Sequence, residues 1–290
     1  MGLMGILHLI RSRIVAVLLY STGLASNLLL LSRVRISQLL FAGGVSVAIS
    51  ATVAAYILSD YLDLKEDRLN NPSRPLPSGR ASVTDAKALI ILSLMVALAA
   101  GFYINVATGF MVALSFVLSS LYSMPFIRGK EKYYTKSLLS WLGGFVGTFT
   151  ASAILFRFSI LSFLVASVNG TMIMLLVMIG DIIDYEGDRA SGVRSIAVTF
   201  GQETALVLME LFLGLLAAFL MGIYYLASYI HPVYLITGLA GIVATYYALI
   251  KLKSSEFDRR AAKMTKQVLR GLYFTIQASL ILGVLLSFMM

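Results

Sequence analysis

The sequence predicts an all-α, polytopic membrane protein built as a nine-helix transmembrane bundle. Of its 290 residues, 59% are hydrophobic and only 13% are charged, and the mean hydropathy is +0.89. A soluble domain carries about 25% charged residues. A bilayer explains the difference, because each spanning helix needs about 20 apolar residues. Apolar runs of this length recur along the whole chain, which predicts a single transmembrane domain over residues 1–290.

The spans are justified by their length and continuity. The runs are too long for barrel strands, and lipid-exposed backbone must satisfy its hydrogen bonds within the segment, which favours helices. The first run follows Arg11 and Arg13 without a small-residue cleavage site, so we interpret it as a spanning helix and not as a signal peptide. The expected spans are 14–32, 36–58, 84–104, 106–123, 137–156, 159–180, 204–227, 231–250 and 269–289.

The basic residues predict the orientation of the chain. With nine spans, 20 of the 23 Lys and Arg residues lie on one side, and the other side holds Arg33, Arg35 and Arg157. The positive-inside rule then puts the N-terminus on the cytoplasmic side of the cell membrane and the C-terminus outside. The active site, which the acidic segments described next are expected to form, would also face the cytoplasm. The net charge of +9 indicates topology and anionic lipid, not nucleic acid. We interpret Lys132, Lys136 and the basic residues of 251–266 as topological charge of this kind.

Two acidic segments share one spacing. Each has aspartates at i, i+3 and i+7, which fall on one face of a helix in successive turns. The first segment follows the second span, and the other ends the sixth, 121 residues later. This repeat predicts two pseudo-repeated halves with both clusters at the cytoplasmic end. The six acids are Asp60, Asp63, Asp67, Asp181, Asp184 and Asp188.

Clustered carboxylates without thiolates indicate a hard cation. The chain has no cysteine and only two histidines, His8 and His231, so a zinc site is a poor fit. Like charges repel each other unless a cation compensates them. Mg²⁺ is usually held by one or two carboxylates together with substrate phosphates. The two clusters therefore predict Mg²⁺ with a diphosphate between them.

Basic side chains follow each acidic segment. Prolines in segment 71–80 end the first helix, and the arginines behind them can reach back to phosphate oxygens. Further basic residues lie after the second acidic segment and between the fourth and fifth spans. The candidates for binding a diphosphate are Arg74, Arg80, Arg128, Lys130, Arg189 and Arg194.

These segments resemble the aspartate-rich motifs of the UbiA superfamily of intramembrane prenyltransferases. The first motif of that family reads Asn-Asp-x-x-Asp-x-x-x-Asp, and here Ser59 stands in the place of the Asn. The resemblance covers essentially the whole chain in topology and implies a nine-helix bundle that uses Mg²⁺. The metal ligands that it implies are Ser59, Asp63, Asp67, Asp184 and Asp188, with Asp60 and Asp181 in support.

Two branches of the superfamily are similar in segment 71–80, the archaeal digeranylgeranylglyceryl phosphate synthases and the chlorophyll synthases. Residues 181–201 resemble the archaeal branch, although Ile183 and Ser195-Ile196-Ala197 depart from its pattern. The resemblance thus implies transfer of a geranylgeranyl group from its diphosphate to geranylgeranylglyceryl phosphate, which forms the second ether bond of archaeal lipids. An aromatic or tetrapyrrole acceptor, as in quinone, chlorophyll or haem biosynthesis, is the alternative.

The implied reaction ionises an allylic C–O bond while Mg²⁺ and basic side chains neutralise the leaving diphosphate. Tyr61 and Tyr122 are candidates for stabilising the allylic cation with their aromatic faces. The proton acceptor stays open between Asp60, Asp181 and the released diphosphate. The expected partners are a prenyl diphosphate, a lipid-like alcohol and the bilayer. The sequence does not indicate which oligomeric state the protein adopts.

Two other classes of protein fit less well. CDP-alcohol phosphotransferases also have aspartates where helices leave the membrane, but their Asp-Gly-x-x-Ala-Arg pattern does not occur here. A membrane transporter is the non-enzyme alternative, yet transporters hold ionisable groups near the bilayer midplane, whereas these acids gather at one face. The sequon Asn169-Gly170-Thr171 lies inside the expected sixth span, which indicates helix packing.

Overall fold

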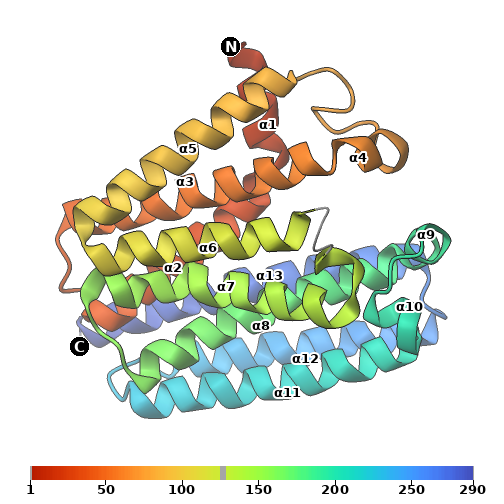
Figure 1. The fold of residues 1–290 in the computed structure, drawn as a ribbon. Helices are drawn as coiled ribbons and strands as arrows, with labels where there is room; N and C mark the ends of the chain where they lie inside the picture. Colours follow the sequence, from red (N-terminus) through yellow and green to blue (C-terminus); the bar gives the residue numbers. More distant parts are fainter. Residues whose placement is uncertain (1, 125–128, 290) are drawn as a thin grey trace.

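The protein is a bundle of long helices aligned along one axis (Figure 1). The computed structural model describes residues 2–124 and 129–289, without the side chains of Glu66, Leu69 and Asn70. Within these ranges nine helices are long and apolar enough to cross a membrane, which confirms the predicted fold class. They are α2 (Ile14–Ser32), α3 (Gln38–Leu62), α5 (Val83–Ile104), α6 (Val106–Ser123), α7 (Tyr133–Leu155), α8 (Ile160–Ile183), α11 (Gln202–Leu226), α12 (Val233–Ser254) and α13 (Arg259–Ser287).

Some spanning helices extend beyond the hydrophobic runs that predicted them. Helix α13 begins at Arg259, ten residues before the expected start, and α3 continues to Leu62 instead of ending at 58. The Asp258 carboxylate caps α13 by accepting hydrogen bonds from the backbone N–H groups of Arg260 and Ala261. Hydropathy marks only the part of a helix that lies in lipid, and a capped polar turn extends the helix into water.

Helix α8 forms the centre of the bundle. In the 18-residue apolar stretch of α8, 72% of the residues are buried inside the protein, compared with 22% in the corresponding stretches of α5 and α12. Glycines let α7 and α8 approach closely: a Cβ on Gly144 would lie 2.9 Å from the carbonyl oxygen of Asn169, and one on Gly170 would lie 2.8 Å from that of Trp141. Small residues at such contacts are typical of membrane helices, which associate through close packing. This packing holds α8 in place, and with it the second acidic segment at the end of that helix.

Shorter helical segments lie outside the spans. They are α1 (Leu3–Ser12), α4 (Leu64–Asn70), η1 (Gly129–Glu131), α9 (Tyr185–Ser191) and α10 (Ile196–Phe200). Helix α1 runs across the direction of the spanning helices and packs against α5 (Figure 1). Helices α4, α9 and α10 lie at one end of the bundle, and the C-terminus lies at the other (Figure 1). The segments after α3 and α8 therefore leave the bundle at the same end.

Neither acidic segment is one continuous helix, which corrects the expectation that its three aspartates share a helix face. Helix α3 ends at Leu62 and α4 begins at Leu64, with Asp63 between them at φ −87° and ψ 2°. Asp184 occupies the same position between α8 and α9, at φ −98° and ψ 9°. Aspartate favours helix ends, because its side chain competes for backbone hydrogen bonds. The break at the middle acid of both segments supports the predicted relation between the two halves.

Candidate functional site

A cavity of about 420 Å³ lies between α2, α3, α6, α7 and α8 and brings the two acidic segments together. Acids of both segments line it, and basic side chains lie among them. The charged residues of its wall are Arg13, Asp63, Asp67, Arg74, Lys130 and Asp184. Asp63 and Asp184, which are 121 positions apart in the chain, thus face one space.

Asp60 is buried beside this cavity and is held by two arginines. Arg13 Nε donates a hydrogen bond to Asp60 Oδ2 at 2.8 Å, and Arg13 Nη2 contacts Oδ1. Arg74 Nη1 lies 3.5 Å from the same Oδ1. Burial lowers the pKa of Arg13, and the nearby Arg74 adds to this effect. An arginine stays charged at physiological pH despite such a shift, so Asp60 serves as its counter-ion.

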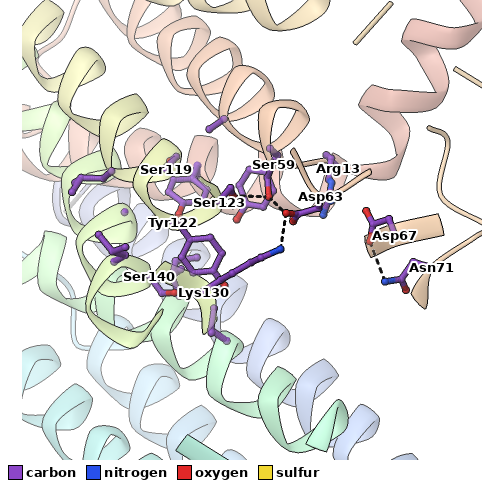
Figure 2. Close-up of a pocket in the computed structure, with 18 of the residues that line it drawn as sticks. Arg13, Ser59, Asp63, Asp67, Asn71, Ser119, Tyr122, Ser123, Lys130 and Ser140 are labelled. Carbon is purple, nitrogen blue, oxygen red and sulfur yellow. Dashed lines mark hydrogen bonds and ion pairs between the residues drawn. The ribbon is translucent and has the colours of Figure 1, made fainter. Parts of the chain in front are cut away.

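Asp63 is joined to a chain of hydroxyl groups and to a lysine (Figure 2). Ser123 Oγ lies 2.9 Å from Ser59 Oγ, and Ser59 Oγ lies 3.4 Å from Asp63 Oδ2. Lys130 Nζ donates to Asp63 Oδ1 at 2.6 Å. Lys130 comes from η1, which lies between α6 and α7. The structure therefore brings together Ser59, Asp63 and Lys130, three residues that the sequence analysis singled out.

Asp67, the third acid of the first segment, is buried below Arg74. Arg74 Nη1 donates to Asp67 Oδ2 at 2.5 Å, and Asn71 Nδ2 donates to Asp67 Oδ1 at 3.3 Å. Both partners come from the loop after α4, so the proline-rich segment folds back toward the acids. All three acids of the first segment thus have basic partners.

The second acidic segment is arranged differently. Lys136 Nζ, from the first turn of α7, lies 2.5 Å from Asp181 Oδ1 and 3.8 Å from Asp188 Oδ2. Asp184 faces the cavity and is exposed, and no hydrogen bond or ion pair reaches its side chain from the described residues. Burial raises the pKa of the Asp188 carboxyl, with Lys136 opposing the shift and Asp184 adding to it.

These groups fit a hard divalent cation. Asp188 Oδ2 is buried and has no hydrogen-bond partner in the described part of the chain, so it has free acceptor capacity. Among the described residues, no group of three or more His, Cys, Asp or Glu side chains is already arranged to hold a metal ion. A preformed cage is not needed for Mg²⁺, which keeps several ligand positions for water and substrate phosphates. Carboxylates on both sides of one cavity suit a metal that arrives with a diphosphate.

The remaining predicted residues lie in different surroundings. Tyr122 lines the cavity, whereas Tyr61 faces α5, with Lys87 Nζ 5.3 Å from its ring centroid. Arg80 is exposed and donates to Ser78 Oγ and to the carbonyl oxygen of Ser73. Three further candidates for diphosphate binding are Arg189 and Arg194, which are exposed outside the cavity wall, and Arg128, which lies outside the described residues.

A narrow, largely apolar space of about 40 Å³, here called the apolar arm, lies next to the cavity and shares part of its wall. Tyr20 and Tyr56 line both spaces, with their ring centroids 6.3 Å apart in an edge-to-face arrangement. The arm is bounded mostly by small and aliphatic side chains, which are Leu24, Val47, Ala48, Ala51, Ala55, Val112, Gly143 and Gly147. A polar cavity with an apolar extension can hold an anionic head and a hydrocarbon tail.

Sequence reasoning missed several residues of this site. Lys136 was interpreted as topological charge, but it forms an ion pair with Asp181. Arg13, Tyr20 and Tyr56 were not singled out, and neither was the role of Asn71. Arg13, Tyr20 and Tyr56 are far in sequence from the acid or ring that they contact, whereas Asn71 is only four residues from Asp67. The one available signal was the presence of Arg13 and Lys136 at the predicted cytoplasmic ends of spans.

Comparison with known proteins agrees with this geometry. The model of the UbiA prenyltransferase family matches residues 18–288. The chain belongs to the UbiA prenyltransferase family. It is therefore a prenyltransferase, and its nine apolar helices make it a multi-pass membrane protein.

Relatives of this family member carry the name digeranylgeranylglyceryl phosphate synthase. The chain is 28% identical to the protein of that name from Methanothermobacter thermautotrophicus over 233 residues, which are 80% of this chain and 81% of the relative. It is 27% identical to the one from Sulfolobus acidocaldarius over 217 residues, which are 73% and 75% of the two chains.

Solved structures share the fold at lower identity. A structure of a digeranylgeranylglyceryl phosphate synthase aligns with a TM-score of 0.74 at 20% identity and covers 97% of both chains. A UbiA homologue from Archaeoglobus fulgidus, bound to GPP and Mg²⁺, aligns with a TM-score of 0.70 at 17% identity, covering 94% of this chain and 99% of that one.

Proposed function

We propose that this enzyme transfers a geranylgeranyl group from geranylgeranyl diphosphate to geranylgeranylglyceryl phosphate, in a reaction that requires Mg²⁺. The observation that carries the proposal is the convergence of Asp63, Asp67 and Asp184 with Arg74 and Lys130 on one cavity that lies next to an apolar arm. Several relatives named digeranylgeranylglyceryl phosphate synthase support the choice of acceptor. The donor class is supported by the family and by its homologue bound to GPP.

The acids and bases of the cavity have separate roles in this proposal. Asp63, Asp67, Asp184 and Asp188 would hold Mg²⁺, with Ser59 beside Asp63. When bound, Mg²⁺ neutralises charge on the leaving diphosphate. Arg74 and Lys130 donate hydrogen bonds to acids at the cavity wall and are close enough to turn toward phosphate oxygens. Arg80, Arg128, Arg189 and Arg194 stay predictions for the outer part of this site.

The hydrocarbon part of the donor would lie along the apolar arm. The allylic C–O bond breaks next to aromatic rings, where Tyr122, Tyr20 and Tyr56 can stabilise a positive carbon and exclude water. Tyr61 faces away from the cavity, so we assign it no contact with the cation. The acceptor hydroxyl oxygen then forms the new ether bond with the allylic carbon.

One proton must leave the acceptor hydroxyl. Asp60 and Asp181 are poor acceptors for it, because each is buried in an ion pair with a basic side chain. We therefore assign the proton to the released diphosphate, which carries the electron pair of the broken C–O bond. The whole chain, residues 1–290, would act as one catalytic domain, with the motif end and the N-terminus on the cytoplasmic side.

An acceptor panel tests the proposal. Purified enzyme in lipid receives radiolabelled geranylgeranyl diphosphate and Mg²⁺, with geranylgeranylglyceryl phosphate or with aromatic acceptors. We expect label on the glyceryl phosphate, lost in Asp63→Ala and Asp184→Ala. Transfer only to an aromatic acceptor would overturn the acceptor, and no transfer together with no metal-dependent donor binding would overturn the proposal as a whole.

A further inference from the structure

Lys136 has an unusual position for a residue at the cytoplasmic end of a membrane helix. Its side chain is only 14% exposed, and its Nζ lies between two acids of the second motif, 2.5 Å from Asp181 Oδ1 and 3.8 Å from Asp188 Oδ2. The side chain of Asp181 is 4% exposed and does not line the cavity. A charge this deeply buried needs a partner, so the two residues depend on each other.

The three acids of the second motif therefore differ in what they can still bind. Asp181 is committed to Lys136. Asp184 faces the cavity, and Asp188 Oδ2 is buried and accepts no hydrogen bond within the described residues. The carboxylate oxygens of this motif that can still bind a cation therefore belong to Asp184 and Asp188.

The first motif repeats one part of this arrangement, the pairing of its leading acid with a basic residue. Asp60, its leading acid, is buried and bound by Arg13, the residue directly before α2. Asp63 and Asp67 line the cavity instead, and each has a basic partner of its own there. In both halves, the leading acid lies in the last turns of a spanning helix and its cation comes from the start of a neighbouring span. The same arrangement at two unrelated basic residues argues against a chance contact.

We propose that Lys136 is a resident cation of the second motif, which commits Asp181 to an internal ion pair and leaves Asp184 and Asp188 to hold one divalent ion. Lys136 and Asp181 cancel each other's charge, so the motif presents two carboxylates to the metal. Asp181 is then a positioning residue that keeps Lys136 away from Asp188. This inference rests on the proposed metal-dependent function and assigns the leading acid of the motif a role other than ligand or base.

A direct consequence concerns the loss of Asp181. In Asp181→Asn the ammonium group of Lys136 loses its partner, and the nearest acid is Asp188, 3.8 Å away. Lys136 would then compete with the metal for Asp188. Removing the lysine as well should relieve this competition, although Asp181 is still absent. A metal ligand would behave differently, because its loss cannot be repaired by removing a neighbouring lysine.

Mn²⁺ binding in the presence of inorganic diphosphate, followed by electron paramagnetic resonance on the full chain in lipid, tests the proposal. The Asp184→Asn variant is the reference, because it shows how much Mn²⁺ binding is lost when the ion at the second motif is lost. We expect Asp181→Asn to weaken that ion's binding by roughly ten- to a hundredfold, the range for a residue that supports a ligand. The double variant Lys136→Met/Asp181→Asn should bind Mn²⁺ within about threefold of the wild type, a difference below 1 kcal/mol.

The matched control is Lys132→Met/Asp181→Asn. Lys132 is exposed and lies four residues before Lys136, so its loss removes the same charge without freeing Asp188, and binding should stay weak. Lys136→Gln/Asp181→Asn, whose side chains can hydrogen-bond to each other, repeats the test if the methionine variant does not fold. A double variant that binds Mn²⁺ as weakly as Asp181→Asn would overturn the proposal, because Asp181 would then be a ligand itself.

The experiment separates this inference from the proposed function. Mn²⁺ binding with inorganic diphosphate needs neither prenyl donor nor acceptor, so a different acceptor would leave its outcome unchanged. No diphosphate-dependent Mn²⁺ binding by the wild type would contradict the metal site and with it both proposals.

Discussion

Arg13 and Asp60 form a buried ion pair that ties the start of α2 to the last turn of α3, with Nε of the arginine 2.8 Å from Oδ2 of the aspartate. The guanidinium also lies over the ring of Tyr56, 5.6 Å from its centroid. One side chain thus connects an acid of the first motif with an aromatic wall of the cavity.

Removing Arg13 should destabilise the protein. In Arg13→Met, Asp60 keeps only the more distant Arg74, so we expect the free energy of unfolding to fall by about 3 kcal/mol, the lower end for a broken buried pair. Arg13→Met/Asp60→Asn should recover part of this loss, because it leaves no unpaired charge. Chemical unfolding in detergent measures both variants. Arg11→Met, at an exposed arginine two residues earlier, should change little, and an equal loss there would contradict the role of the pair.

The apolar arm should set the length of the prenyl chain that the enzyme accepts. Ala51 lines the arm, and Ala51→Phe would fill it. We expect kcat/KM for geranylgeranyl diphosphate to fall by about tenfold or more relative to dimethylallyl diphosphate, since even one methylene in an apolar pocket changes specificity by about that factor. Donor competition measures the ratio. Ala42→Phe, on the exposed face of the same helix, is the control. An unchanged ratio in Ala51→Phe would show that the tail lies elsewhere.

Asn169 should contribute to stability and not to catalysis. Its Oδ1 accepts hydrogen bonds from Tyr273 Oη at 2.7 Å and from Gln277 Nε2 at 3.1 Å, which link α8 to α13 inside the bundle. Asn169→Ala should lower the free energy of unfolding by about 1–2 kcal/mol, as expected for buried hydrogen bonds between membrane helices. Activity per folded molecule should stay the same. Ser46→Ala, at an exposed serine of α3, serves as the control, and a loss of activity without a loss of stability would refute this role.

The two ends of the bundle should be accessible from opposite sides of the membrane. The chain contains no cysteine, so Ser78→Cys and Ser228→Cys each introduce a single thiol at an exposed loop residue. The positive-inside rule predicts that the basic loops face the cytoplasm, so a membrane-impermeant maleimide applied to intact cells should label position 228 and not position 78. Labelling of position 78 alone would reverse the orientation that we propose.

Much of the fold could be predicted from the sequence because the bilayer restricts the alternatives. The spans 14–32 and 106–123 agree with α2 and α6 to the residue, since nothing but a helix satisfies its own backbone in lipid. The start of α13 at Arg259 could not be predicted from hydropathy, because its first turns are polar and depend on the cap of Asp258.

The acidic residues of the candidate site could be identified from the sequence, but several of its basic residues could not. A repeated spacing at 60–67 and 181–188 identifies the acids without knowledge of the packing. The same spacing cannot say which acid faces the cavity, since this depends on the helix breaks at Asp63 and Asp184. The spacing also does not identify Lys136 as the partner of Asp181. In the sequence Lys136 is one of many basic residues near the ends of spans, and the ion pair forms only because α7 packs beside α8.

The sequence by itself determined the membrane class, the number of spans, the two acidic motifs and the family resemblance, because these depend on local hydrophobicity and spacing. Only the tertiary structure decided that Arg13 and Lys136 take the leading acids as partners, and that Tyr20 and Tyr56 stand between a polar cavity and an apolar arm. These relationships join residues 36 to 47 positions apart on different helices. They exist only after close packing has brought those helices together, and no local pattern records them.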